Sequence, residues 1–118
     1  MYKETKIGGQ SVALLSNAAT PIWYHQLFHK DVVKNLADAQ NDTSIAVNMA
    51  PEIAYIMMNQ AAKTDMSTLN IEKYIAWLET FGAIDFVNAT EEIWEAYYGT
   101  AQTSSSSKKK QNAKQTEK

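Results

Sequence analysis

The sequence predicts a mainly α-helical domain, in which an N-terminal β-hairpin precedes a compact bundle of four or five short helices and a disordered C-terminal tail. Gly8-Gly9 separates two short segments, as in a hairpin turn. From residue 20 onward, apolar residues recur at the helical period. No large apolar residue follows Thr103, so residues 101–118 are predicted to be disordered and residues 1–100 to form the folded domain.

The hairpin is expected over residues 2–15, because glycine reaches the positive φ angles that tight turns require. In its second segment Val12 and Leu14 alternate with Ala13 and Leu15, so both faces carry apolar groups. An isolated hairpin is marginally stable in water. We therefore expect it to pack on the helices or to pair with another chain, and its open edge is a candidate site for strand addition.

Residues 20–36 predict a helix, a corner and a second helix. Thr20 is expected to cap the first helix, and Pro21 suits its first position because the missing N–H has no partner there anyway. Asp31 is expected to start the second helix. The predicted buried face consists of Tyr24, Leu27, Phe28, Val32 and Leu36.

The next helix lies within residues 44–63, after a polar loop, and its start has two interpretations. Pro51 either begins the helix, with Glu52 favourable in the first turn, or bends an earlier helix capped by Thr43. Residues 52–62 are apolar nearly all round. Such a helix is either central to the core or covered by a partner.

A further helix is predicted from Asn70, its cap, through about Phe81, with Gly82 ending it in the left-handed conformation. Its apolar stripe consists of Ile71, Tyr74, Ile75, Leu78 and Phe81.

Residues 84–87 are expected to form a short bridge or helical turn before the last helix. Thr90 is the expected cap of that helix, and Gly99 its stop. Glu91 and Glu92 suit the positive end of the helix dipole.

Charge divides unevenly along the chain and bears on the partner. Residues 1–100 carry six lysines and twelve acidic residues, a net charge of −6, and residues 101–118 carry a net charge of +4. There is no arginine. An acidic domain without arginine argues against nucleic-acid binding, including a helix-turn-helix use of residues 20–36. No apolar run approaches the roughly 20 residues of a membrane helix, so a soluble intracellular protein is expected.

Catalytic and metal-binding patterns are weak. Cysteine is absent, which excludes disulfides and thiolate chemistry. His25 and His29 stand four residues apart, as paired zinc ligands can, but no further ligand accompanies them, and two surface histidines are the preferred interpretation. The carboxylates lie near predicted helix starts, which explains them without catalysis. We therefore expect no enzymatic activity, no cofactor and no metal.

Large aromatic and methionine side chains are the better indication of function, and they suggest partner binding. The candidate interface residues are Trp23, Met57, Met58, Trp77, Trp94, Tyr97 and Tyr98. A core position is the first interpretation for most of them, but Trp and Tyr are enriched at binding hot spots, and adjacent methionines make adaptable surfaces. Trp23 and Trp77 are predicted to face a partner, since each falls off the main stripe of its helix.

Several short motifs follow one another along residues 2–98. After the hairpin they are Ala19-Thr20-Pro21 with Tyr24, Leu27-Phe28, Lys30-Asp31, Glu52-Ile53-Ala54-Tyr55-Ile56-Met57, Tyr74-Ile75-Ala76-Trp77-Leu78-Glu79-Thr80-Phe81 and Glu92-Ile93-Trp94. Their order and spacing resemble the tail assembly chaperones of long-tailed, siphovirus-like phages and prophages of Gram-positive bacteria.

This resemblance implies a non-enzymatic protein made in the cytoplasm of the infected host and encoded just before the tape measure protein. Such chaperones coat and solubilise the tape measure protein, help to recruit tail tube subunits, and are absent from the mature virion. The resemblance also implies a longer product of ribosomal frameshifting, which would carry the tail tube contact. Self-association is expected as well, because a domain of about 100 residues has only a modest core. Lys108-Lys109-Lys110 is compatible with a slippery codon run.

The alternative function is a small helical adaptor or regulator that binds a single host or phage protein. An acidic domain with excess aromatic residues fits this function as well. Co-expression with the neighbouring large helical protein separates the two hypotheses, because rescue of its solubility favours the chaperone.

Overall fold

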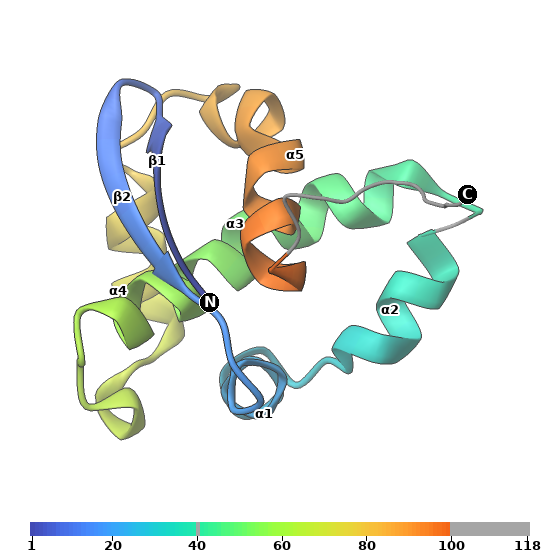
Figure 1. The fold of residues 1–118 in the computed structure, drawn as a ribbon, viewed down its shortest axis with the longest axis horizontal. Helices are drawn as coiled ribbons and strands as arrows, with labels where there is room; N and C mark the ends of the chain where they lie inside the picture. Colours follow the sequence, from blue (N-terminus) through green and yellow to red (C-terminus); the bar gives the residue numbers. More distant parts are fainter. Residues whose placement is uncertain (40, 100–118) are drawn as a thin grey trace.

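The computed structural model describes residues 1–39 and 41–99. Within them, an antiparallel hairpin precedes five α-helices and one turn of 3-10 helix, which confirms the predicted fold class (Figure 1). The predicted disordered tail, 101–118, lies outside the described residues. The elements are β1 (Tyr2–Ile7), β2 (Gln10–Leu15), α1 (Thr20–Phe28), α2 (Val32–Ala39), α3 (Thr43–Ala61), η1 (Met66–Thr68), α4 (Ile71–Leu78) and α5 (Asp85–Tyr98).

Helix α3 is the centre of the domain, and the hairpin, α1, α2, α4 and α5 all contact it. The helix begins earlier than Pro51, which lies inside it, so the interpretation with an earlier helix start is confirmed. The cap is Asp42 rather than Thr43, because its carboxylate accepts a hydrogen bond from the Ser44 N–H at 3.1 Å. The second half of α3 supplies the fully buried core residues Ile53, Ala54, Ile56 and Met57.

The hairpin pairs over residues 2–15 as predicted, with Ile7 opposite Gln10 at the turn. Gly8 takes a φ of +58°, and a Cβ there would overlap the Asp85 carboxylate, so this turn needs glycine on both counts. Val12 and Leu14 face α3 and are buried. Strand β1 lies on the side of α5 (Figure 1). The hairpin is therefore held by the helices.

Helices α1 and α2 form the predicted corner. His29 ends α1 in the left-handed conformation, with φ +58°, and the Asp31 carboxylate accepts from the Lys34 N–H at 3.1 Å to start α2. The prediction that Thr20 caps α1 is wrong. Thr20 is fully buried inside the helix, and its hydroxyl donates to the Gln60 side chain at 2.7 Å, which ties α1 to the end of α3.

Helix α4 begins as predicted but ends earlier. The Asn70 side chain accepts from the Lys73 N–H at 2.8 Å, which confirms the cap. The last helical residue is Leu78, and Gly82 has no positive φ, so the predicted left-handed stop is wrong. The Gly82 N–H instead donates to the Asp85 carboxylate at 2.7 Å, in the turn that leads into α5.

Helix α5 begins at Asp85, five residues before the predicted cap. Thr90 lies inside the helix, where its hydroxyl donates to the Phe86 carbonyl at 2.8 Å. Gly99 ends the helix with φ +71°, as predicted. Because α5 starts at Asp85, residues 85–87 belong to its first turn, which confirms the helical turn rather than the bridge as the prediction for residues 84–87.

Candidate partner-binding groove

An apolar groove of about 710 Å³ lies between α2, α3 and α5. Its lining consists of Val32, Val33, Leu36, Ala37, Ala39, Ala46, Trp94, Tyr97 and Tyr98. None of these residues is charged. Helix α2 and the first half of α3 project away from the hairpin, and in this view the end of α5 lies between the hairpin and α2 (Figure 1). We call this hollow the α2–α5 groove.

The aromatic wall of the groove comes from the last turns of α5. Residues 94, 97 and 98 are spaced by three and four positions, so they share one side of the helix. The Trp94 indole N–H donates to the Ala46 carbonyl of α3 at 3.1 Å, which fixes the ring against α3. The Trp94 and Tyr97 rings pack edge to face, with centroids 5.6 Å apart.

Both tyrosines of this wall are neutral at physiological pH. Burial raises the pKa of Tyr97 and of Tyr98 above the usual value of a phenol. Tyr98 nevertheless keeps 56% of its surface exposed. Trp94 itself is buried, so the accessible part of the wall is uncharged and comes from half-buried Tyr97 and exposed Tyr98.

Helix α2 supplies the facing wall. Val32 is buried, Leu36 is half-buried, and Val33 is 76% exposed although it is branched and fully apolar. Sequence reasoning did not identify Val33, Leu36 or Ala46 as interface residues. Two adjacent valines at the start of a helix, one on the buried stripe and the other beside it, are the signal that could have found this wall.

The structure brings together only three of the seven predicted interface residues, namely Trp94, Tyr97 and Tyr98. Trp23 is half-buried and lines a separate hollow of about 270 Å³ between α1 and η1. Met58 and Trp77 are half-buried and line a third hollow, of about 260 Å³, beside β2. The predicted residues therefore do not form one continuous surface.

Met57 and Trp77, two of the predicted interface residues, take part in packing within the domain. Met57 corrects the prediction at one position, because it is fully buried under the elements that cover α3 and has no surface to offer a partner in this fold. Trp77 contacts the rings of Tyr55, Phe81 and Phe86, with centroids 5.1 to 5.3 Å apart. Although Trp77 lies off the main apolar stripe of α4, its ring therefore packs within the domain.

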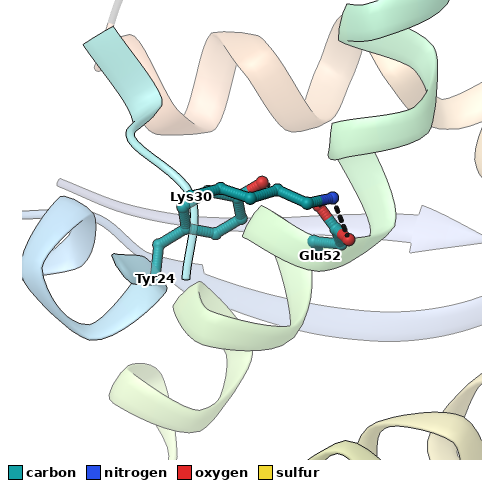
Figure 2. A network of polar contacts seen from close by, with 3 residues as sticks. All are labelled: Tyr24, Lys30 and Glu52. Atoms are coloured by element: carbon teal, nitrogen blue, oxygen red, sulfur yellow. Dashed lines mark hydrogen bonds and ion pairs between the residues drawn. The ribbon is translucent and has the colours of Figure 1, made fainter. Parts of the chain in front are cut away.

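A polar network fastens the helix corner to α3 (Figure 2). The Tyr24 hydroxyl donates to the Glu52 carboxylate at 2.7 Å, and the Lys30 ammonium pairs with the same carboxylate at 2.9 Å. Burial, and then the hydrogen bond to Glu52, raises the pKa of Tyr24 far above its usual range. Both Glu52 oxygens have partners within the chain, so the network acts as a structural clamp.

The two histidines do not come together as a metal site. His25 is exposed on α1, with Nδ1 3.3 Å from the Lys30 carbonyl oxygen, and His29 lies at the corner beyond the helix. In residues 1–39 and 41–99, no three His, Cys, Asp or Glu side chains are grouped to hold a metal ion. No helix in the same residues has the length and apolar character needed to cross a bilayer.

Comparison of the chain with known protein families, characterised proteins and solved structures finds no match. The α2–α5 groove combines a volume of about 710 Å³ with a lining that contains no charged residue.

Proposed function

We propose that this protein is a tail assembly chaperone of a long-tailed phage or prophage, and that its α2–α5 groove binds apolar helical segments of the tape measure protein. The observation that carries the proposal is the uncharged groove lined by exposed Val33 and Tyr98, on a domain whose residues 1–100 carry a net charge of −6. The motif order along residues 2–98, which resembles that family, supports the same function.

The groove suits an apolar helix better than a polar ligand. Amphipathic helices dock by placing residues spaced by three and four positions into an apolar groove. Here two walls, α2 and the end of α5, carry valine, leucine and aromatic side chains, and no charged side chain selects a particular partner sequence. Such a groove accepts many related segments, which is what a long, repetitive helical client requires.

The charge of the folded domain supports the second part of a chaperone function, which is solubility. Binding buries the apolar walls and leaves the acidic residues of the domain facing water. Net negative charge on the outside of a complex opposes its aggregation. Chaperone copies along the client would therefore keep it dispersed in the cytoplasm of the infected host until the tail is assembled without them.

Recruitment of tail tube subunits belongs to the same proposal and is assigned to a longer, frameshifted form of the chain. The candidate slippery site, Lys108-Lys109-Lys110, lies outside the described residues. The mass spectrum of the expressed gene tests it, because a frameshifted product switches to the sequence of another reading frame after these lysines and is longer than 118 residues.

The alternative function, an adaptor or regulator of one protein, uses the same groove for one defined helix. The two functions differ in stoichiometry. Many copies of a chaperone bind along a single client, whereas an adaptor binds its partner in a fixed small ratio.

The test is co-expression with the tape measure protein, which the proposal expects to be a large, helix-rich protein encoded directly downstream. The wild-type chain is expected to move that protein into the soluble fraction. Val33→Asp places a charge in the groove wall at a site that is 76% exposed, so the fold should persist while client solubility falls several-fold.

The matched control is Val87→Asp, which makes the same change at a 54% exposed position on the first turn of α5, away from the groove. This variant should solubilise the client like the wild type. Equal loss in both variants, or in neither, would overturn the assignment of the groove. A complex of fixed one-to-one ratio would favour the adaptor.

A further inference from the structure

The outer edge of β2 is open, and its hydrogen-bonding pattern can be read from the register. Met1 and Ser16 exchange both backbone hydrogen bonds, so they form a hydrogen-bonded pair at the end of the hairpin. Such pairs alternate along an antiparallel ladder. The N–H and C=O groups of Ser11, Ala13 and Leu15 therefore point away from β1, and no partner for them is seen in residues 1–39 and 41–99.

The two edges of the hairpin differ in how well they are protected from pairing with another strand. Beside β1 lies α5, whose Glu95 pairs with Lys3 at 3.1 Å and whose Glu92 accepts from Thr5 at 3.2 Å. Strand β1 also carries Glu4 and Lys6, and charged residues discourage edge pairing. Strand β2 runs as Gln-Ser-Val-Ala-Leu-Leu, with no charge, proline or glycine. It lacks the features that normally blunt an edge.

The surface next to this edge is apolar as well. A hollow of about 260 Å³ lies between β2 and residues of α3, of α4 and of the segments that follow these two helices. Beyond the strand, its lining consists of Met58, Ala61, Ala62, Trp77 and Phe81. At the turn end, the Gln10 side chain donates to the Thr80 carbonyl at 2.9 Å, so the open stretch of edge begins at Ser11.

We propose that the β2 edge pairs with the β2 edge of a second copy of this chain, in antiparallel orientation, to give a continuous four-stranded sheet. An uncharged edge is self-compatible, because two copies bring no like charges together. Antiparallel pairing of a strand with itself satisfies two-fold symmetry, the commonest symmetry of homodimers. The small side chains of Ser11 and Ala13 allow the close approach, and the apolar hollows of both copies then meet beneath the junction.

The pattern of outward groups fixes the register. Ala13 lies opposite Ala13 of the second copy, and Ser11 lies opposite Leu15 of the second copy, on each side of the axis. Each of these pairs exchanges two backbone hydrogen bonds. The pairing uses a surface distinct from the α2–α5 groove, so it does not depend on client binding.

The first experiment measures the mass of the full-length chain by light scattering over a concentration series, without client. With rising concentration, the measured mass of the wild-type protein should approach twice the chain mass of 13.2 kDa. Ala13→Pro removes only an outward N–H, because edge positions tolerate proline, and it should raise the dissociation constant at least about tenfold. Glu4→Pro, opposite Ala13 in the hairpin register, removes the equivalent N–H from β1 and should leave the dimer intact.

The second experiment fixes the register and uses the absence of cysteine in the chain. Ala13→Cys introduces one thiol at the axis, where a Cα separation of about 5.5 Å suits a disulfide. Oxidation should give a covalent dimer with Ala13→Cys and none with Glu4→Cys. This variant also decides the matter if Ala13→Pro fails to fold.

A wild-type chain that stays monomeric at every concentration would overturn the proposal. So would a dimer that Glu4→Pro disrupts as strongly as Ala13→Pro. Covalent dimers formed only in a mixture of Ala13→Cys and Glu4→Cys would show pairing of β2 with β1 of the other copy, and would equally refute the two-fold junction.

Discussion

Seven aromatic rings run through the interior from α1 to α5, whereas three others gather at the end of α5 beside the groove. The first set, which we call the inner cluster, consists of Tyr24, Phe28, Tyr55, Tyr74, Trp77, Phe81 and Phe86. The second, the groove cluster, consists of Trp94, Tyr97 and Tyr98. Both clusters consist of aromatic side chains, but their rings contact different parts of the fold.

Rings of the inner cluster pack mainly against rings of other elements. Phe28 of α1 meets Tyr74 of α4, which meets Tyr55 of α3. Among the described residues, rings of the groove cluster contact no ring outside it, while buried Trp94 joins the apolar core and donates a hydrogen bond to α3. The inner cluster therefore holds elements together, while the groove cluster is anchored by Trp94 and leaves Tyr98 at the surface. Stability and partner binding should respond to different substitutions.

The largest expected effect comes from Trp77→Ala, which removes a ring that touches three others. We expect the free energy of unfolding to fall by about 3 kcal/mol, at the lower end for such substitutions because Trp77 is half-buried. Urea unfolding, followed by circular dichroism, measures the change. Client solubilisation, measured while the variant is still folded, should be unchanged.

The matched control is Trp23→Ala, which removes the same side chain from another half-buried site. Among residues 1–39 and 41–99, Trp23 has no ring neighbour of the kind that surrounds Trp77, so a smaller loss is expected. Equal losses would mean that contacts between rings add nothing beyond burial, and the distinction between the clusters would fail.

The elements of this fold were largely predictable from local patterns. Gly8-Gly9, Asn70, Asp31 and Gly99 act as predicted, because each meets a requirement set by its nearest neighbours in the chain. Thr90 was predicted to be a cap, but threonine can bond equally to a carbonyl four residues earlier. Only the true start of the helix, at Asp85, decides between the two, and the sequence pattern did not mark it.

The groove was only partly predictable. The spacing of residues 94, 97 and 98 places them together on any helix, so their common surface follows from the sequence. The opposite wall depends on how α2 turns at the corner and packs on α3, which no local pattern contains. Met57 and Met58 illustrate the same limit, since tertiary packing buries one completely and leaves the other at a surface hollow.

An intermediate effect is expected at Tyr24, where the inner cluster meets the polar clamp. Tyr24→Phe keeps the ring but removes the hydroxyl that donates to Glu52, at a cost of about 1.5 kcal/mol near neutral pH. The pKa of Tyr24 is raised in the folded state, so its contribution to stability is complete below the unfolded tyrosine pKa and is lost as the pH rises above it. The variant should therefore lose less stability than wild type between about pH 8 and about pH 11.

Urea midpoints at the two pH values provide the measurement, and Tyr98→Phe is the control in the groove cluster. Burial raises the pKa of Tyr98 as well, but no carboxylate partner accepts from its hydroxyl among the described residues, so its effect at neutral pH should be small. Tyr24→Phe is still expected to lose some stability at alkaline pH, since the pKa of Tyr74 is also raised. Parallel curves for wild type and Tyr24→Phe would contradict the clamp as the source of the alkaline sensitivity.

The smallest effect on stability, and the sharpest separation of the two clusters, is expected for Tyr98→Ala. The side chain is 56% exposed, so its loss should change the free energy of unfolding by no more than about 0.5 kcal/mol. At an interface, truncation of a tyrosine commonly costs more than about 1 kcal/mol of binding, because the partner loses the apolar surface that covered it. Tyr98→Ala should therefore weaken client capture while the urea midpoint stays near that of wild type, the reverse of Trp77→Ala. If both variants lost stability and client capture in proportion, the groove cluster would be part of the core, and the partner surface would have to be sought elsewhere on the domain.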